Sequence, residues 1–205
     1  MRNKHVLDMA SLSPGEIKQI LETAERMKEI SRRAIKKVPT LRGKTVVHFF
    51  YEPSTRTKSS FDIAAKRLSA DSMSFSKATS SVVKGETLLD TIQNIEAMQP
   101  DIIVIRHSSA GAPHMLAKMC QARVINAGDG MHAHPTQALL DMMTVREKKG
   151  RLNGLNLLIV GDIAHSRVAR SNIVGFQKMG AKVMLAGPPT MMPRGIEAQG
   201  VTIAD

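Results

Sequence analysis

The chain has 205 residues, of which 42% are hydrophobic, and this fits one large globular domain or two small ones. No stretch approaches the roughly 20 apolar residues of a membrane span, and the N-terminus lacks the apolar core of a signal peptide. A single cysteine, Cys120, excludes an internal disulfide framework and is typical of a reducing compartment. We therefore expect a cytoplasmic protein with no membrane partner, in which Cys120 is a buried packing residue.

The net charge of +11 narrows the expected partners to nucleic acids, acidic surfaces and small anions. Aromatic residues make up only 3% of the chain, and no motif that reads DNA or RNA occurs. Several basic residues also lie within the motifs described below, so small anions are the favoured partners and nucleic acid is the minor alternative. Much of the remaining charge is expected at the solvated end of the first helix, in Arg26, Lys28, Arg32, Arg33, Lys36 and Lys37.

The first predicted helix follows Ser13, because Ser13-Pro14-Gly15-Glu16 is a capping box with proline at the first helical position. Its apolar stripe runs from Ile17 to Met27. Strands and helices then alternate, and strands such as 102–105 are continuously apolar, which is typical of a parallel α/β sheet. The expected strands lie near 45–50, 72–75, 102–106 and 123–126, and the expected helices near 55–68, 87–98 and 113–120.

A second unit is expected after a helix that runs from Pro135 to about Lys149 and ends at Gly150. The pattern then predicts a strand near 155–160, a helix near 168–179, a strand near 182–186 and the start of another near 201–203. The predicted fold class is therefore α/β. Residues 1–134 form a parallel sheet flanked by helices, residues 135–150 form a linking helix, and residues 151–205 form an incomplete second α/β domain.

The segment Phe49-Phe50-Tyr51-Glu52-Pro53-Ser54-Thr55-Arg56-Thr57 is the most informative in the chain. The apolar run before Pro53 indicates a buried strand, and Ser54 then stands at the N-cap position of a helix. The N–H groups and the dipole of a helix start attract anions, and three hydroxyl groups and one guanidinium add donors. We therefore expect a phosphate site here. The simpler interpretation, a serine cap followed by a polar first turn, is favoured for the cap alone but not for the whole run.

Further polar side chains are expected at strand ends and helix starts. Arg106 ends a predicted strand, where parallel sheets bind their ligands. His134 stands at a helix cap, and Gln137 follows three residues later, so both face a ligand at that helix start. Arg167 begins another helix after a strand-to-helix turn. The candidate residues outside the first segment are therefore Ser80, Lys84, Arg106, His134, Gln137 and Arg167.

Taken in order, these segments resemble the catalytic chains of the aspartate carbamoyltransferase family. The resemblance depends on F-F-Y-E-P-S-T-R-T, K-G-E-T-L-L-D-T, V-I-R-H, N-A-G-D-G with H-P-T-Q, and G-D-I-A-H-S-R-V-A-R-S. Each motif alone is weak, but five in order are specific, and together they cover the whole chain. The related ornithine carbamoyltransferases share S-T-R-T and an H-P-x-Q segment, whereas K-G-E-T and H-P-T-Q favour the aspartate enzyme.

The resemblance implies a transferase of pyrimidine biosynthesis that moves the carbamoyl group of carbamoyl phosphate to L-aspartate and releases phosphate. This reaction needs two aligned anions and stabilisation of charge on a carbonyl oxygen, so no cofactor, metal or covalent intermediate is expected. The implied roles place Ser54, Thr55, Arg56 and Thr57 on the phosphate, Thr57, Arg106 and His134 on the carbonyl oxygen, Gln137 on the carbamoyl nitrogen, and Arg167 on an aspartate carboxylate.

The resemblance also implies a homotrimer, because Ser80 and Lys84 of such chains reach into the site of a neighbouring subunit. A regulatory chain or a dihydroorotase is a further partner in this family. Its chains have two domains of roughly 150 residues each, so this sequence is expected to end within the second domain and to lack part of the amino-acid site. Two alternatives to the aspartate enzyme stay open, which are an ornithine-type transferase and a non-catalytic fragment that binds carbamoyl phosphate.

Two remaining motifs have simpler interpretations. His132, His134 and Asp129 are residue types that bind zinc, but the spacing lacks the third and fourth ligands of a zinc site, so no metal is expected. Gly161-Asp162 follows a predicted strand, yet the fingerprint G-x-G-x-x-G is absent, which argues against a dinucleotide site. His107 has no role that the sequence indicates.

Overall fold

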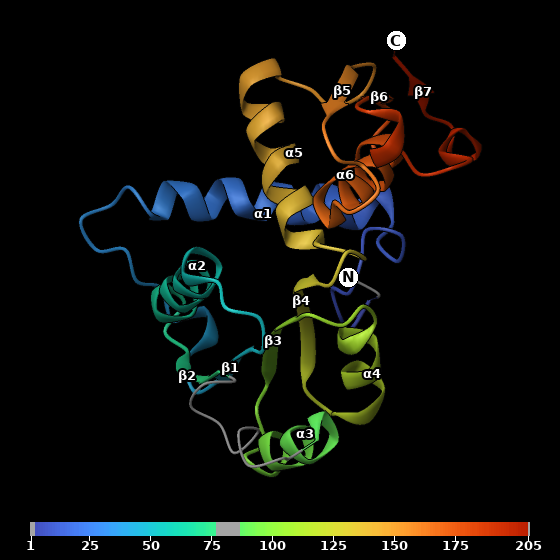
Figure 1. The fold of residues 1–205 in the computed structure, drawn as a ribbon. Coiled ribbons are helices and arrows are strands. Elements are labelled where there is room, and N and C mark those ends of the chain that lie inside the picture. Colours follow the sequence, from blue (N-terminus) through green and yellow to red (C-terminus); the bar gives the residue numbers. More distant parts are fainter. Residues whose placement is uncertain (1–2, 77–86, 205) are drawn as a thin grey trace.

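The computed structural model describes residues 3–76 and 87–204, which form two parallel β-sheets with their helices (Figure 1). Within these two ranges, no helix is long and apolar enough to cross a membrane. The helices are α1 (Pro14–Ile30), α2 (Thr55–Arg67), α3 (Leu88–Ala97), α4 (Ala112–Met119), α5 (Pro135–Lys149) and α6 (Arg167–Lys178), with short 3₁₀ helices η1 (Pro39–Leu41), η3 (Pro189–Met191) and η4 (Ile196–Gln199). The strands are β1 (Thr45–Phe50), β2 (Asp71–Ser76), β3 (Ile102–His107), β4 (Arg123–Asp129), β5 (Asn156–Val160), β6 (Lys182–Ala186) and β7 (Thr202–Ile203).

The first sheet has the strand order β2-β1-β3-β4, and all of its strands are parallel. Its two central strands, β1 and β3, are not consecutive in the chain, and Phe50 of β1 pairs with Arg106 of β3. The chain leaves β1 toward one edge of the sheet and leaves β3 toward the other, which makes their carboxyl ends a switch point. Ligands of open α/β sheets bind in the crevice at such a point.

Helices cover both faces of the first sheet, since alternate residues of β1 pack against different helices (Figure 1). Val47 and Phe49 share a core with residues of α3 and α4, whereas Val46 and Phe50 pack with Ala65 of α2. Burial on both faces explains why these strands are continuously apolar instead of alternating. The predicted α/β fold with a helix-flanked parallel sheet is confirmed.

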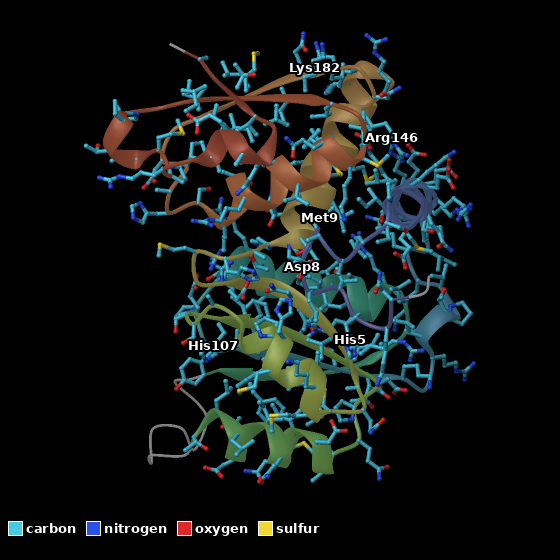
Figure 2. The ribbon with its side chains drawn as sticks, turned by 90° about the vertical axis from the view of Figure 1, so that its right-hand side faces the viewer. His5, Asp8, Met9, His107, Arg146 and Lys182 are labelled. Atoms are coloured by element: carbon cyan, nitrogen blue, oxygen red, sulfur yellow. The ribbon has the colours of Figure 1, made fainter. Side chains whose placement is uncertain are left out.

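The second sheet has the order β5-β6-β7, is also parallel, and packs on α5, α6 and α1. Its core contains Met9 and Leu21 from the N-terminal part of the chain together with Met142 and Phe176. Figure 2 accordingly shows Met9 at the junction of the two halves. The proposed division at residue 134 did not anticipate this packing, because the apolar stripe of α1 predicts a buried face but not its partner.

The predicted strands and helices agree with the structure to within one or two residues, except at β4. The prediction ends this strand near 126, whereas it continues to Asp129. Asn126 and Asp129 are completely buried, and the Asn126 Nδ2 donates to Asp129 Oδ1 at 2.8 Å. The main-chain N–H of Asn126 also donates to the carbonyl of Val6 at 2.8 Å. Asn126 and Asp129 are residue types that favour a loop, but here their hydrogen-bonding groups find partners inside a strand.

Two expectations from the composition are confirmed. Cys120 is buried in the core that contains Leu116, and burial raises the pKa of its thiol, so it packs and is held protonated. The basic residues assigned to the end of the first helix are exposed, and they lie in the last turns of α1 and the segment that follows, at Arg26, Lys28, Arg32, Arg33, Lys36 and Lys37.

Candidate active site

A cleft with a volume of about 690 Å³ lies beyond the carboxyl ends of β1 and β3, between the first sheet and helices α5 and α6. The starts of α2, α5 and α6 meet there. Thr55 lines a separate hollow beside β2, and Ser80 and Lys84 lie outside the described residues. The predicted residues that line the cleft are Ser54, Arg56, Thr57, Arg106, His134, Gln137 and Arg167.

Ser54 is the N-cap residue of α2, but its side chain does not cap the helix. Its backbone is extended, with φ −160° and ψ 97°, and its Oγ donates to the Oγ1 of Thr57 at 2.9 Å. The expectation that Ser54 serves as an ordinary cap is therefore wrong, because its hydroxyl pairs with another hydroxyl. The N–H groups of the first turn have no side-chain acceptor from Ser54, which leaves the positive end of the helix dipole open to an anion.

Glu52 joins Arg106 and Arg167, two arginines that line the cleft. Arg106 donates to its Oε1 from Nη2 and, at 3.1 Å, from Nε. Arg167 donates from Nη1 to Oε2 at 3.1 Å and from Nη2 to Oε1 at 2.9 Å. The hydrogen bonds from Arg167 and then Arg106 outweigh partial burial and lower the pKa of Glu52 to about 2. Glu52 is thus ionised throughout the neutral range.

Glu52 is a functional residue that was not predicted from the sequence. A signal was present, since the only carboxylate of the first motif stands directly between the strand and the hydroxyl-rich helix start. Two guanidinium groups close together repel each other unless a counter-charge lies between them. Its partners lie 54 and 115 positions further along the chain, so the pairing itself depends on the fold.

The end of β4 and the turn after it bring Arg167 and His134 together. Gly128 has a φ of 114°, and a Cβ there would lie 3.0 Å from the Arg167 Cζ and 3.3 Å from the His134 Cδ2. Gly130 has a φ of 48°, and its carbonyl oxygen accepts a hydrogen bond of 3.0 Å from Arg167 Nη1. The two glycines of N-A-G-D-G are therefore needed both for the backbone conformation and for space beside the site.

His134 is held as a neutral imidazole at the start of α5. Its main-chain N–H donates to Ser171 Oγ at 2.8 Å, and the residue is only 6% exposed. Burial, followed by the positive charges of Arg167 and Arg106, lowers its pKa to about 4. The Oγ1 of Thr136 lies 3.3 Å from His134 Nδ1. When Nδ1 accepts from that hydroxyl, Nε2 carries the proton and is a donor.

Gln137 is oriented by a chain of hydrogen bonds between α5 and α6. Its Nε2 donates to Asp141 Oδ1 at 2.9 Å, and the Nδ2 of Asn172 donates to the other carboxylate oxygen at 2.8 Å. Because the amide nitrogen is engaged, the carbonyl oxygen of Gln137 is the end available as an acceptor. It suits a ligand that presents an amide-like NH₂ group.

His107 and Tyr51 pack together at the carboxyl ends of β3 and β1. Their rings stack with centroids 4.5 Å apart, and His107 Nδ1 accepts from the main-chain N–H of Ser109 at 2.9 Å. No role for His107 could be predicted from the sequence, and this packing supplies a structural one. The main-chain N–H of Tyr51 donates to the carbonyl of Arg106 at 2.8 Å, which ties the loop after β1 to the end of β3.

Comparison with known proteins agrees with this geometry. The family model described as aspartate/ornithine carbamoyltransferase, carbamoyl-P binding domain, matches residues 4–147. The chain belongs to this carbamoyltransferase family.

Similar family members are bacterial catalytic subunits of aspartate carbamoyltransferase. The one from Desulforapulum autotrophicum is 71% identical over 202 residues, which cover 98% of this chain and 65% of that relative. The one from Desulfosudis oleivorans is 69% identical over 203 residues, which cover 99% of this chain and 65% of that relative. The chain therefore spans slightly less than two thirds of the length of these curated carbamoyltransferases.

Solved structures of the family share the fold. The catalytic subunit of the M. jannaschii aspartate transcarbamoylase matches with a TM-score of 0.87 and 36% identity, over 98% of this chain and 67% of that chain. The Trypanosoma cruzi aspartate transcarbamoylase in complex with carbamoyl phosphate and aspartate matches with a TM-score of 0.88 and 30% identity, over 97% of this chain and 65% of that chain. The resemblance stated from the motifs is thus confirmed at the level of family and fold.

Proposed function

We propose that this chain carries the carbamoyl phosphate site of an aspartate carbamoyltransferase, which transfers the carbamoyl group to L-aspartate in pyrimidine biosynthesis. The observation that carries the proposal is that Arg56, Arg106 and His134 line one cleft, although they come from three separate segments. The names of the relatives support the aspartate reaction. The ornithine-type reaction is the alternative that the experiment below separates.

The phosphate group is proposed to bind at the start of α2. The open N–H groups of the first turn and the hydroxyls of Ser54 and Thr57 are neutral donors, whereas the predicted hydroxyl of Thr55 lines the separate hollow beside β2. Arg56 adds a guanidinium that grips two phosphate oxygens at once. Charge-assisted hydrogen bonds contribute about 1.5–3 kcal/mol each, so Arg56 is expected to supply a large part of the affinity.

The carbonyl oxygen is proposed to accept hydrogen bonds from Thr57, Arg106 and His134. The aspartate amine attacks the carbonyl carbon, a C–N bond forms, the C–O bond to phosphate breaks, and the amine proton leaves with the phosphate. Negative charge on the carbonyl oxygen grows as the transition state is approached. Each fixed donor stabilises this charge and typically raises the rate by about 10²- to 10³-fold. A neutral His134 donates without giving up a proton.

Glu52 is proposed to be exchanged for the substrate anions as the ion-pair partner of the two arginines. Its two arginine partners also line the cleft, so a carbamoyl phosphate dianion competes with Glu52 for Arg106. Arg167 is proposed to bind an aspartate carboxylate, which replaces the same Glu52 carboxylate with a substrate carboxylate. Gln137 is proposed to accept from the carbamoyl NH₂ group. Each arginine therefore has a protein partner before the substrate arrives.

The assembly and the compartment are part of the proposal. A homotrimer in which Ser80 and Lys84 complete a neighbour's site, in the cytoplasm, is what the family resemblance implies. Sedimentation equilibrium of the purified chain measures the first, and a mass other than three chains contradicts it.

The function is tested with carbamoyl phosphate and either L-aspartate or L-ornithine, by measuring the carbamoylated amino acid. Carbamoyl-aspartate is the expected product, and product from ornithine alone assigns the ornithine-type reaction. Calorimetry with carbamoyl phosphate is run in parallel. Binding without product identifies a non-catalytic fragment, and the absence of both contradicts the site itself.

A further inference from the structure

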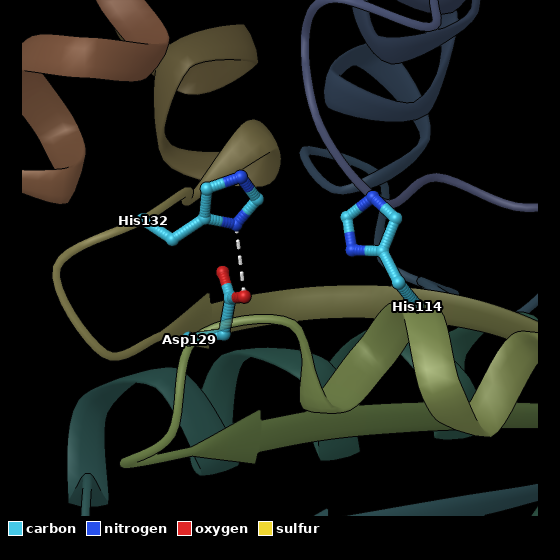
Figure 3. Close-up of side chains that lie close together, drawn as sticks. All are labelled: His114, Asp129 and His132. Atoms are coloured by element: carbon cyan, nitrogen blue, oxygen red, sulfur yellow. Dashed lines mark hydrogen bonds and ion pairs between the residues drawn. The ribbon is translucent and has the colours of Figure 1, made fainter.

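A second group of polar side chains lies on the other side of the turn that follows β4 (Figure 3). His114 comes from α4, Asp129 from the end of β4, and His132 from the turn. One potential ligand atom of each residue lies within 4.8 Å of the other two. The carboxylate of Asp129 is completely buried, and the two imidazoles are partly exposed. The group is therefore buried on the side of Asp129 and accessible to solvent on the side of the histidines.

The two ring nitrogens of His114 have different surroundings. Nε2 lies 2.8 Å from Asp8 Oδ2, whereas Nδ1 is buried and has no hydrogen-bond partner among the described residues. Figure 3 shows this second nitrogen turned toward Asp129 and His132. A histidine that binds a metal through one nitrogen usually donates from the other to a carboxylate, which fixes its tautomer and orientation. The Asp8–His114 pair has this arrangement.

Asp129 is fixed in place by the backbone around it. Its Oδ1 accepts from Asn126 Nδ2 at 2.8 Å and from the Ala133 N–H at 3.1 Å. Its Oδ2 accepts from the Gly111 N–H at 2.7 Å and lies 2.9 Å from His132 Nδ1. The carboxylate therefore cannot turn away, and only the contact with His132 lies on the open side.

We propose that His114 Nδ1, Asp129 Oδ2 and His132 Nδ1 form a binding site for a divalent transition ion of the zinc type, with water as the fourth ligand. Two imidazoles and one carboxylate are a common ligand set for zinc. Bonds of about 2.0–2.2 Å place tetrahedral ligands about 3.3–3.6 Å apart. The ion would replace the proton between His132 and Asp129, and small rotations of the two imidazoles would close the remaining distance.

The fold supplies what the local spacing lacked. From the sequence, Asp129, His132 and His134 were the possible zinc ligands. His134 belongs to the cleft, however, and the third ligand comes from α4 instead. A bound ion would cross-link α4 to the turn that contains Gly130, whose carbonyl holds Arg167. The site would therefore brace the cleft from behind without contacting its ligands.

The same chain contains a matched control. His165 and Asp162 have the same three-residue separation as His132 and Asp129, with His165 Nδ1 3.0 Å from the carboxylate, and both residues are largely exposed. No third ligand in the described part of the chain accompanies that pair. In the described part of the chain, a histidine–aspartate pair with this three-residue separation thus occurs twice, and only one copy has the additional histidine.

The experiment titrates Zn²⁺ into the metal-stripped chain and records heat, then repeats the titration with Co²⁺ and records visible absorption. One ion per chain and the absorption of tetrahedral Co²⁺ are expected. His132→Asn, on an exposed turn, should remove both signals, and Asp8→Asn should weaken Zn²⁺ binding about 10- to 100-fold. His165→Asn should leave both unchanged.

Two outcomes overturn the proposal. One is the absence of stoichiometric Zn²⁺ binding by the folded wild-type chain. The other is equal Zn²⁺ affinity of His132→Asn and wild type, which would place the ion elsewhere. His114→Asn provides an independent check, and its circular dichroism spectrum establishes whether the chain is folded before the titration is interpreted.

Discussion

Two of the helix starts at the cleft, those of α2 and α5, differ from the starts of α1 and α3 elsewhere in the chain. α1 and α3 begin with complete capping boxes at Ser13 and Thr87. The N-cap residues of α2 and α5 are Ser54 and His134, and neither side chain accepts a hydrogen bond from a main-chain N–H of its own helix. A side-chain cap satisfies the N–H donors that a bound anion would use. The side-chain caps are thus absent at the two cleft-facing starts of α2 and α5, whereas α4 lacks one because its N-cap residue is Gly111.

This difference separates two uses of the same local feature. A capped start contributes to stability, and an open start at a polar cleft contributes to binding. α6 combines both, because Ser166 caps it through the Ala169 N–H at 3.1 Å while Arg167, its first residue, extends into the cleft. A helix start that lacks a stabilising side-chain cap and faces a polar cleft is therefore expected to be a functional site.

The largest expected effect is a pH dependence at the open start of α5. The pKa of His134 is lowered from 6.5 to about 4 in the folded chain. Between pH 6.5 and 4 the unfolded chain then binds more protons than the folded chain. The contribution of neutral His134 to the free energy of unfolding is therefore complete above pH 6.5, and about 3 kcal/mol is lost as the pH falls toward 4. Urea unfolding of His134→Asn across this range should show a smaller loss than wild type.

His5 and His48 also have pKa values lowered by burial, so a residual loss of stability is expected in the variant. Only the difference between the two proteins reports on His134. Identical pH dependence of wild type and variant would show that His134 is not a buried neutral group.

The next effect concerns binding at the open start of α2. Arg56→Ala should weaken carbamoyl phosphate binding by about 10- to 150-fold, which corresponds to one charge-assisted hydrogen bond of about 1.5–3 kcal/mol. Isothermal titration calorimetry measures the change. Arg33→Ala is the control, because Arg33 is an exposed arginine beyond the end of α1. Equal losses in the two variants would mean that general positive charge, not the cleft, binds the anion.

A capped start should respond in the opposite way. Ser13→Ala removes the acceptor for the Glu16 N–H and should lower the free energy of unfolding by about 1 kcal/mol. Carbamoyl phosphate affinity should stay at the wild-type value. Urea denaturation and calorimetry on the same preparation provide both numbers. A stability loss below about 0.5 kcal/mol would remove the contrast between the two kinds of helix start.

The smallest stability effect is expected for the matched serine in the cleft. Ser54→Ala removes no helix cap, so the free energy of unfolding should change by less than about 0.5 kcal/mol. Its carbamoyl phosphate affinity should nevertheless fall, because a phosphate donor is lost. A destabilisation as large as that of Ser13→Ala, with unchanged affinity, would assign Ser54 a purely structural role.

The sequence predicted what depends on neighbouring residues. The strand end and helix start around Arg56 lie within one short segment, so their signals are local and the cleft residues they carry are brought together as expected. It did not predict the pairing of Glu52 with Arg106 and Arg167, because those contacts join distant segments. The cap predicted at Ser54 does not form, because its hydroxyl pairs with the hydroxyl of Thr57 instead of accepting from an N–H of the first turn.

The packing of α1 has a consequence for the order of synthesis. Leu21 emerges early from the ribosome, but its partners Met142 and Phe176 follow much later. At roughly 5–20 residues per second, the stretch from Leu21 to Met142 takes about 6 to 24 s to translate. During that interval the apolar stripe of α1 has no native surface to cover it. The nascent chain therefore exposes an apolar helix surface that is prone to aggregation. A chaperone that covers such surfaces should raise the yield of folded protein.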